Sequence, residues 1–326
     1  MFSWYARCAL VGLVIGITHD SATADDNVLG LPAPIDARQP GAVVLHGGGD
    51  ITDEVFERFV ELAGGREARI VLVPSAGYRV SDYDSEKEFL DEMGSRYCSW
   101  VDLAVAGRVR GFQFLYTDNP DDADNADFVR PLELATGVWF SGGAQKRLNY
   151  RYVGEFPRQT RFQAALVRIV ERGGAVGGTS AGMAALPEIM TLRDARENSH
   201  APAKVVAAHG LGLLKQAIVE QHLDARGGRL ERFTRLLRDS SQLDELAGRK
   251  GAGNHMLGLA VEEGGALFVR GDHLEVRGTA NVHVFLKSEE SRKVAWHELE
   301  PGDVAELKRD SSHAIELTQE DRLSSR

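Results

Sequence analysis

Three short apolar segments of this chain are each followed by consecutive glycines, and this repeated pattern restricts the fold more than any other feature. The segments are 42–45, 137–140 and 175–176, and the glycines are Gly47-Gly48-Gly49, Gly142-Gly143 and Gly177-Gly178. Helical apolar patterns at 55–63 and 162–170 lie between them, the first capped by Thr52 or Asp53. This alternation predicts an α/β fold with a mostly parallel sheet and helices on both faces. We therefore expect a site where the glycine turns gather, at the carboxyl ends of the strands.

Shorter patterns extend this sheet. A buried strand is predicted at 69–73, a helix at 86–93 and a strand at 217–222. Four short apolar segments separated by turn residues, at 259–261, 266–269, 273–276 and 282–285, predict antiparallel hairpins near the C-terminus, at one sheet edge. We expect a lead-in at 25–40, a single domain at 41–300 and a polar C-terminal tail at 301–326.

The N-terminus has the pattern of a secretory signal peptide. Arg7 precedes the apolar run 8–17, and Ala22-Thr23-Ala24 is a small-residue cleavage site. The run is shorter than the roughly 20 residues that span a bilayer as a helix. We expect residues 1–24 to be removed, leaving a secreted or periplasmic protein without a membrane anchor. The alternatives are a retained anchor and a misassigned start codon.

Charge and composition narrow the classes of partner. The formal net charge of −10 argues against nucleic-acid binding, which usually needs a basic face. An acidic run could suggest calcium, but it lacks the glycine and terminal glutamate of an EF-hand loop. That run consists of Asp118, Asp121, Asp122, Asp124 and Asp127. No His/Cys cluster suggests zinc, so we expect neither a metal nor a cofactor.

The segment Gly177-Gly178-Thr179-Ser180-Ala181-Gly182 has the spacing of a nucleophile elbow. Such a turn lifts the Ser180 hydroxyl out of the sheet and aims the following N–H groups at one point, where an oxyanion could bind. The alternative is a turn between strand and helix without a catalytic role, because such turns often contain the same glycine and serine residues. A serine nucleophile also needs a base within hydrogen-bond reach.

Of the ten histidines, His222 is the best candidate for that base, because the strand at 217–222 delivers it to the same sheet edge as Ser180. Arg226 and Arg229 follow it and could bind an anionic group of a substrate. His46 also ends a strand, but we expect it to have no direct role.

These motifs together resemble the serine peptidase family that includes cyanophycinase and dipeptidase E. The resemblance rests on the Ser180 segment, Gln221-His222, Phe140-Ser141-Gly142-Gly143-Ala144-Gln145 and Leu45-His46-Gly47-Gly48-Gly49-Asp50, and it spans about residues 40 to 286. It implies a fold like class I glutamine amidotransferases, with Ser180 as nucleophile and His222 as base. Backbone N–H groups of Gly143 and Ala181 would form the oxyanion hole. Residues at family positions that line the substrate pocket are Gln145, Glu220, Gln221, Arg226 and Arg229.

The resemblance also places an acid between the serine and the histidine. Glu188, Asp194 and Glu197 are candidates, and Glu197 is favoured because Glu197-Asn198-Ser199 is similar to an acidic stretch in cyanophycinases. The implied activity is hydrolysis of aspartyl peptide bonds, including the β-linked Asp–Arg type, through an acyl-enzyme. A homodimer is one candidate assembly.

Two other functions remain open. The chain departs from the family at Ala144, Leu223 and Gly228, which favours a binding or sensing protein that has lost turnover. An α/β-hydrolase esterase also uses G-x-S-x-G, but its histidine lies near the C-terminus.

Overall fold

A computed structural model describes residues 40–195, 204–239, 241–287, 293–309 and 315–319. The predicted signal peptide (1–24) lies outside these residues, as does the lead-in up to residue 39. Within the described part, no helix is both long and apolar enough to cross a membrane.

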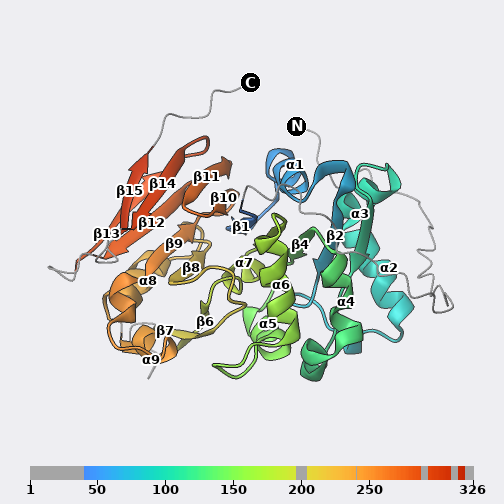
Figure 1. Cartoon of the computed structure of the whole chain (residues 1–326), viewed down its shortest axis with the longest axis horizontal. Coiled ribbons are helices and arrows are strands. Elements are labelled where there is room, and N and C mark those ends of the chain that lie inside the picture. Colours follow the sequence, from blue (N-terminus) through green and yellow to red (C-terminus); the bar gives the residue numbers. More distant parts are fainter. Residues whose placement is uncertain (1–39, 196–203, 240, 288–292, 310–314, 320–326) are drawn as a thin grey trace.

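A nine-stranded sheet forms the centre of the fold, in the order β15-β14-β11-β10-β1-β5-β4-β2-β3 (Figure 1). Its parallel part consists of β1 (Ala42–His46), β2 (Arg69–Val73), β3 (Gly111–Phe114), β4 (Gly137–Phe140) and β5 (Ala175–Thr179). The antiparallel part consists of β10 (Gly265–Arg270), β11 (His273–Gly278), β14 (Val304–Arg309) and β15 (Ile315–Gln319). The predicted mixed architecture is thus confirmed.

Alternate residues of the parallel strands face two separate hydrophobic clusters, as expected of strands buried on both faces. Val43, Val71 and Val138 pack in one cluster with α4 (Ala126–Leu134), α5 (Gln145–Tyr152) and α6 (Arg161–Glu171). Val44, Leu72 and Trp139 pack in the other with α1 (Asp53–Leu62) and α3 (Cys98–Val105). A further helix, α2 (Glu86–Arg96), precedes α3. Helices therefore cover both faces of the sheet.

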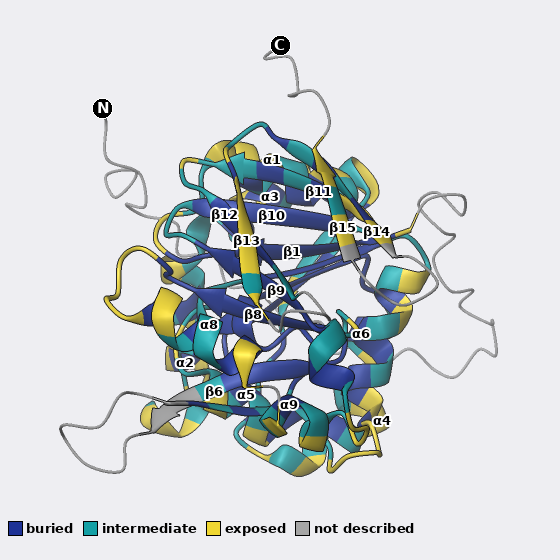
Figure 2. Ribbon diagram, turned by 90° about the vertical axis from the view of Figure 1, so that its left-hand side faces the viewer, coloured by how far each residue is buried: buried dark blue, intermediate teal, exposed yellow. Residues whose placement is uncertain are grey.

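A second sheet of four strands, in the order β13-β12-β9-β8, lies beside the first. It consists of β8 (Ala217–Gln221), β9 (Leu257–Val261), β12 (Val282–Lys287) and β13 (Val294–Leu299). Strands β8 and β9 are parallel, and α8 (Arg229–Arg238) packs on them through Phe233. Figure 2 shows that β13 is exposed along most of its length, whereas β1 and β10 are buried. Three smaller elements are α7 (Ala181–Ala184), α9 (Ser241–Leu246) and the hairpin of β6 (Ile189–Ala195) and β7 (Lys204–His209).

The C-terminal region differs from the sequence prediction in two ways. The four predicted strands exist, but β10 and β11 join the central sheet while β9 and β12 belong to the second one, so they do not share one edge. The prediction of a polar tail at 301–326 is wrong for 304–309 and 315–319, which form β14 and β15. The reason is that β14 lacks a continuous apolar run: Ala305 and Leu307 are buried, while Glu306 and Lys308 between and after them are less so.

Truncating Leu307 tests whether β14 is part of the folded core. Because its side chain is 6% exposed, Leu307→Ala should lower the free energy of unfolding by about 2–3 kcal/mol, the usual cost of a cavity. Lys308→Ala, on the exposed face of the same strand, should change it by less than about 0.5 kcal/mol. Urea denaturation measures both, and equal small effects would indicate a frayed tail instead.

Candidate active site

Ser180 occupies a strained turn between β5 and α7. Its φ is 53° and its ψ is −117°, a conformation that L-residues rarely adopt. The turn is tight: a Cβ added at Gly178 would lie 2.6 Å from the carbonyl carbon of Gly182. The Ser180 N–H donates to the carbonyl of His46, at the end of neighbouring β1, at 2.8 Å. This is the geometry of a nucleophile elbow, as the sequence predicts.

His222, which directly follows β8, lies within hydrogen-bond distance of Ser180. The Ser180 Oγ and His222 Nε2 are 2.6 Å apart. The other ring nitrogen, Nδ1, is hydrogen-bonded to the carboxylate of Glu263. Because a carboxylate only accepts, Nδ1 carries the proton and Nε2 of the neutral ring accepts from the Ser180 hydroxyl. The three side chains form a Ser–His–Glu chain of hydrogen bonds.

Glu263 is none of the three acids that the sequence predicts for this role. Glu197 lies outside the described residues, Glu188 is 3.6 Å from Lys215, and Asp194 lies in β6. The carboxylate beside His222 instead follows the histidine in sequence, because β9 pairs in parallel with β8 and places Val261 opposite Gln221. Residues just beyond these two strand ends are therefore neighbours. The sequence does contain a signal for this acid: Glu263 lies just after the predicted strand at 259–261 and directly before Gly264.

Burial keeps the imidazoles at this sheet edge neutral. It lowers the pKa of His222 below its usual value of 6.5, and the positive charge of Arg226 lowers it further, while Glu263 opposes both. His46 is fully buried, and burial lowers its pKa to about 4. His46 Nδ1 is 2.7 Å from Thr179 Oγ1, whereas the imidazole that contacts Ser180 Oγ is that of His222. At neutral pH, His222 can accept a proton from Ser180.

The two residues predicted for an oxyanion hole flank the nucleophile. Ala181 is the first residue of α7, directly after Ser180. The glycines after β4 lie against the elbow, since a Cβ added at Gly142 would be 3.5 Å from the Ser180 Cβ. Gly143 has a φ of 144°, and its backbone approaches Ala76 so closely that an added Cβ would lie 2.3 Å from that carbonyl oxygen. Whether the N–H groups of Gly143 and Ala181 bind an oxyanion stays a prediction.

Two of the predicted pocket residues contact each other. Glu220 is 1% exposed, and its carboxylate is hydrogen-bonded to Arg229 and lies 3.2 Å from Arg232. Arg229 also donates to the carbonyl of Gln221 at 2.6 Å. Because the Glu220 carboxylate is buried and paired with two arginines, removing either partner would leave an uncompensated charge. The group therefore holds the junction between β8 and α8 together. Glu220 and Arg229 thus fix the backbone that precedes His222.

The other predicted pocket residues differ in their exposure. Arg226 is exposed on the loop after His222. Gln145, at the start of α5, donates to the carbonyl of Thr191 at 3.1 Å. Gln221 is 3% exposed, and its Oε1 has no hydrogen-bond partner among the described residues. Buried acceptors are normally satisfied, so Gln221 Oε1 is an exception among the described residues.

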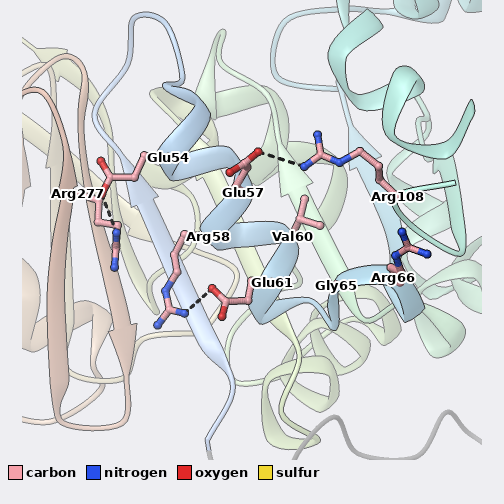
Figure 3. A pocket seen from close by; sticks show the side chains of 9 residues that line it. All are labelled: Glu54, Glu57, Arg58, Val60, Glu61, Gly65, Arg66, Arg108 and Arg277. Carbon is pink, nitrogen blue, oxygen red and sulfur yellow. Dashed lines mark hydrogen bonds and ion pairs between the residues drawn. The ribbon is translucent and has the colours of Figure 1, made fainter. Parts of the chain in front are cut away.

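A cavity of about 520 Å³ lies elsewhere, along the outer face of α1 (Figure 3). Charged side chains line it, and several of them pair with one another, as in Glu54–Arg277 and Arg108–Glu57. None of its lining residues belongs to the Ser180–His222–Glu263 chain. In the described residues, no group of three or more His, Cys, Asp and Glu side chains could hold a metal ion.

Comparison with known proteins identifies the family of this chain. The model of peptidase family S51 matches residues 43–277. The chain is 29% identical over 233 residues to a cyanophycinase from Geminocystis herdmanii (strain PCC 6308), covering 71% of this chain and 74% of that protein. It is 31% identical over 175 residues to a cyanophycinase from Synechococcus elongatus, covering 53% of this chain and 48% of that protein. A crystal structure of a peptidase from an acI-B1 Actinobacterium has a TM-score of 0.54 at 21% identity, covering 83% of this chain and 98% of that one.

The acid of this site, Glu263, follows the histidine in sequence. This order differs from that of an esterase of the α/β-hydrolase fold, where the acid lies between serine and histidine. It also differs from the position between Ser180 and His222 that the resemblance implied. The S51 model covers most of the described chain, and the fold is similar to that of a solved peptidase. The protein belongs to peptidase family S51 and is a cyanophycinase-like serine peptidase.

Proposed function

We propose that this peptidase hydrolyses aspartyl peptide bonds, including the β-linked Asp–Arg type, with Ser180 as nucleophile, His222 as general base and Glu263 as the acid of the triad. The observation that carries the proposal is the continuous chain from the Ser180 hydroxyl through the neutral His222 ring to Glu263. Positioned in this way, the hydroxyl can transfer its proton to Nε2 while its oxygen attacks a peptide carbonyl.

The reaction has two halves. In the first, the Ser180 oxygen bonds to the carbonyl carbon, His222 Nε2 takes the hydroxyl proton, and the ring then gives that proton to the departing amine. In the second, water loses a proton to Nε2, attacks the acyl-enzyme and releases the carboxylic acid, and Ser180 regains its proton. Glu263 keeps the proton on Nδ1 and stabilises the imidazolium that forms twice. The predicted oxyanion donors are the N–H groups of Gly143 and Ala181.

Charges around His222 support a substrate with a carboxylate. Arg226 is exposed and close enough to lower the pKa of His222, so it can bind an anionic group near the scissile bond. Glu220 is engaged with Arg229 and Arg232, so we do not assign it to a substrate guanidinium. Relatives named cyanophycinase support the Asp–Arg class of substrate.

Removing the nucleophile tests the reaction itself. With β-Asp-Arg dipeptides, aspartyl dipeptides and cyanophycin as substrates, Ser180→Ala should lower kcat on the order of a million-fold and leave the fold intact. His222→Ala should cost nearly as much, and the double variant should be little worse, because the two side chains act as a unit. Additive losses would place His222 outside the proton-transfer path. A wild-type protein that cleaves none of these substrates would rule out the proposed specificity.

Replacing each candidate acid distinguishes Glu263 from the residues that the sequence favours. Glu263→Ala should lower kcat on the order of 10⁴-fold, as loss of a triad acid does. Because Glu263 raises the pKa of His222, this variant should also move the acidic limb of the pH–rate profile to lower pH. Glu188→Ala and Glu197→Ala are the controls and should retain wild-type activity. A large loss in Glu197→Ala with an active Glu263→Ala would reverse the assignment.

Arg226 can be tested for two separate effects. The neutral His222 ring is the active form, so kcat/KM should fall as the pH drops through a pKa that lies below 6.5. Arg226→Gln removes a charge that lowers this pKa, so the limb should move to higher pH, whereas Arg226→Lys should leave it in place.

Both variants should cleave a substrate with a free carboxylate at least roughly tenfold less efficiently, since lysine lacks the planar fork. An amidated substrate, assayed above the limb, should be insensitive to both. Equal losses on the two substrates would exclude Arg226 from carboxylate binding.

A further inference from the structure

The carbonyl oxygens of three consecutive residues, at the end of β1, each accept a hydrogen bond from a different segment of the site. His46 accepts from the N–H of Ser180 at 2.8 Å, and Gly47 accepts from the N–H of His222 at 3.1 Å. Gly48 accepts from the N–H of Gly264, the residue after Glu263, at 2.8 Å. The nucleophile, the base and the acid therefore share one short backbone segment as their common support.

The same segment also contacts the imidazole. Gly48 has a φ of 121°, and a Cβ added to it would lie 2.1 Å from His222 Cε1, 2.6 Å from Nδ1 and 3.0 Å from Nε2. The three nearest atoms all belong to the ring of His222, so the imidazole lies directly against the Gly48 backbone. An added methyl group could be accommodated only by moving the ring.

We propose that residues 46–48 position the triad and that Gly48, by lacking a side chain, allows the His222 ring to reach Ser180 and Glu263 together. The inference rests on the proposed function of these three residues and adds Gly48 as a positioning residue. A methyl group at Gly48 would displace the ring from both hydrogen bonds. A misplacement of about 1 Å in catalytic geometry can cost on the order of a hundred-fold in rate.

Gly49 provides a matched control. It also has a positive φ, 75°, but the nearest atoms to an added Cβ are 3.7 Å and 3.9 Å away, at ordinary contact distance. Gly49→Ala thus also places an alanine at a positive φ, but its methyl group does not contact His222. We expect Gly48→Ala to lower kcat on the order of a hundred-fold or more, with little change in KM, and Gly49→Ala to remain close to wild type. Equal kcat values for the two variants would overturn the proposal.

A stability measurement tests the same contact without relying on turnover. The decrease in Tm caused by Gly48→Ala should be clearly smaller in a His222→Ala background, because the ring that the methyl group displaces is then absent. The decrease caused by Gly49→Ala should be the same in both backgrounds. If Gly48→Ala does not fold alone, it should fold when combined with His222→Ala. An unchanged Tm decrease, or a double variant that also fails to fold, would contradict the proposal.

The two readouts separate this inference from the proposed function. The proposed function would be wrong, but the Gly48 contact supported, if the wild-type protein hydrolyses no aspartyl substrate while the Tm decrease caused by Gly48→Ala still depends on His222. The Gly48 proposal would be wrong, but the proposed function supported, if the wild-type protein is active while Gly48→Ala and Gly49→Ala have the same kcat and the same Tm.

Discussion

The parallel pairing of β1 with β5 is the constraint on which the rest of the site depends. It places His46 opposite Thr179, so that the next residues of both strands leave the sheet at the same point. Ser180 turns back over β5 there, held by its N–H to the carbonyl of His46. Without this register, the N–H of Ser180 would lose its hydrogen bond to β1. The position of the nucleophile is thus determined by strand pairing, before any other catalytic side chain is considered.

The base and the acid come from a different sheet. His222 and Glu263 follow β8 and β9, which belong to the four-stranded sheet, and the pairing of Gln221 with Val261 aligns their ends. Two backbone hydrogen bonds, from His222 to Gly47 and from Gly264 to Gly48, join this alignment to the central sheet. The site is therefore built across two sheets whose connection at the glycine turn sets the distance between nucleophile and base.

Sequence patterns identify what lies at the ends of strongly apolar strands, and they fail where the decisive contact is between distant segments. Ser180 and His222 could be predicted because each lies a few residues beyond a short apolar segment, 175–176 and 217–219 respectively. Glu263 has the same local context, but choosing it requires knowing that β9 lies beside β8. The β14 strand was not predicted because charged residues, Glu306 and Lys308, interrupt its apolar ones. The pairing of Glu220 with Arg229 could not be read from spacing alone, because it depends on how α8 leaves the loop after His222.

Backbone strain is concentrated around this site. In the described chain, only Ser180, Gln216 and His222 have positive φ values among residues other than glycine, and Gln216 and His222 flank the two ends of β8. Each such conformation costs on the order of 1–3 kcal/mol and persists only where the surroundings fix it. Here the surroundings are buried strands with hydrogen-bonded ends, which can offset that cost. The stable core of the two sheets thus supports a nucleophile and a base in backbone conformations that neither residue would adopt in an isolated segment.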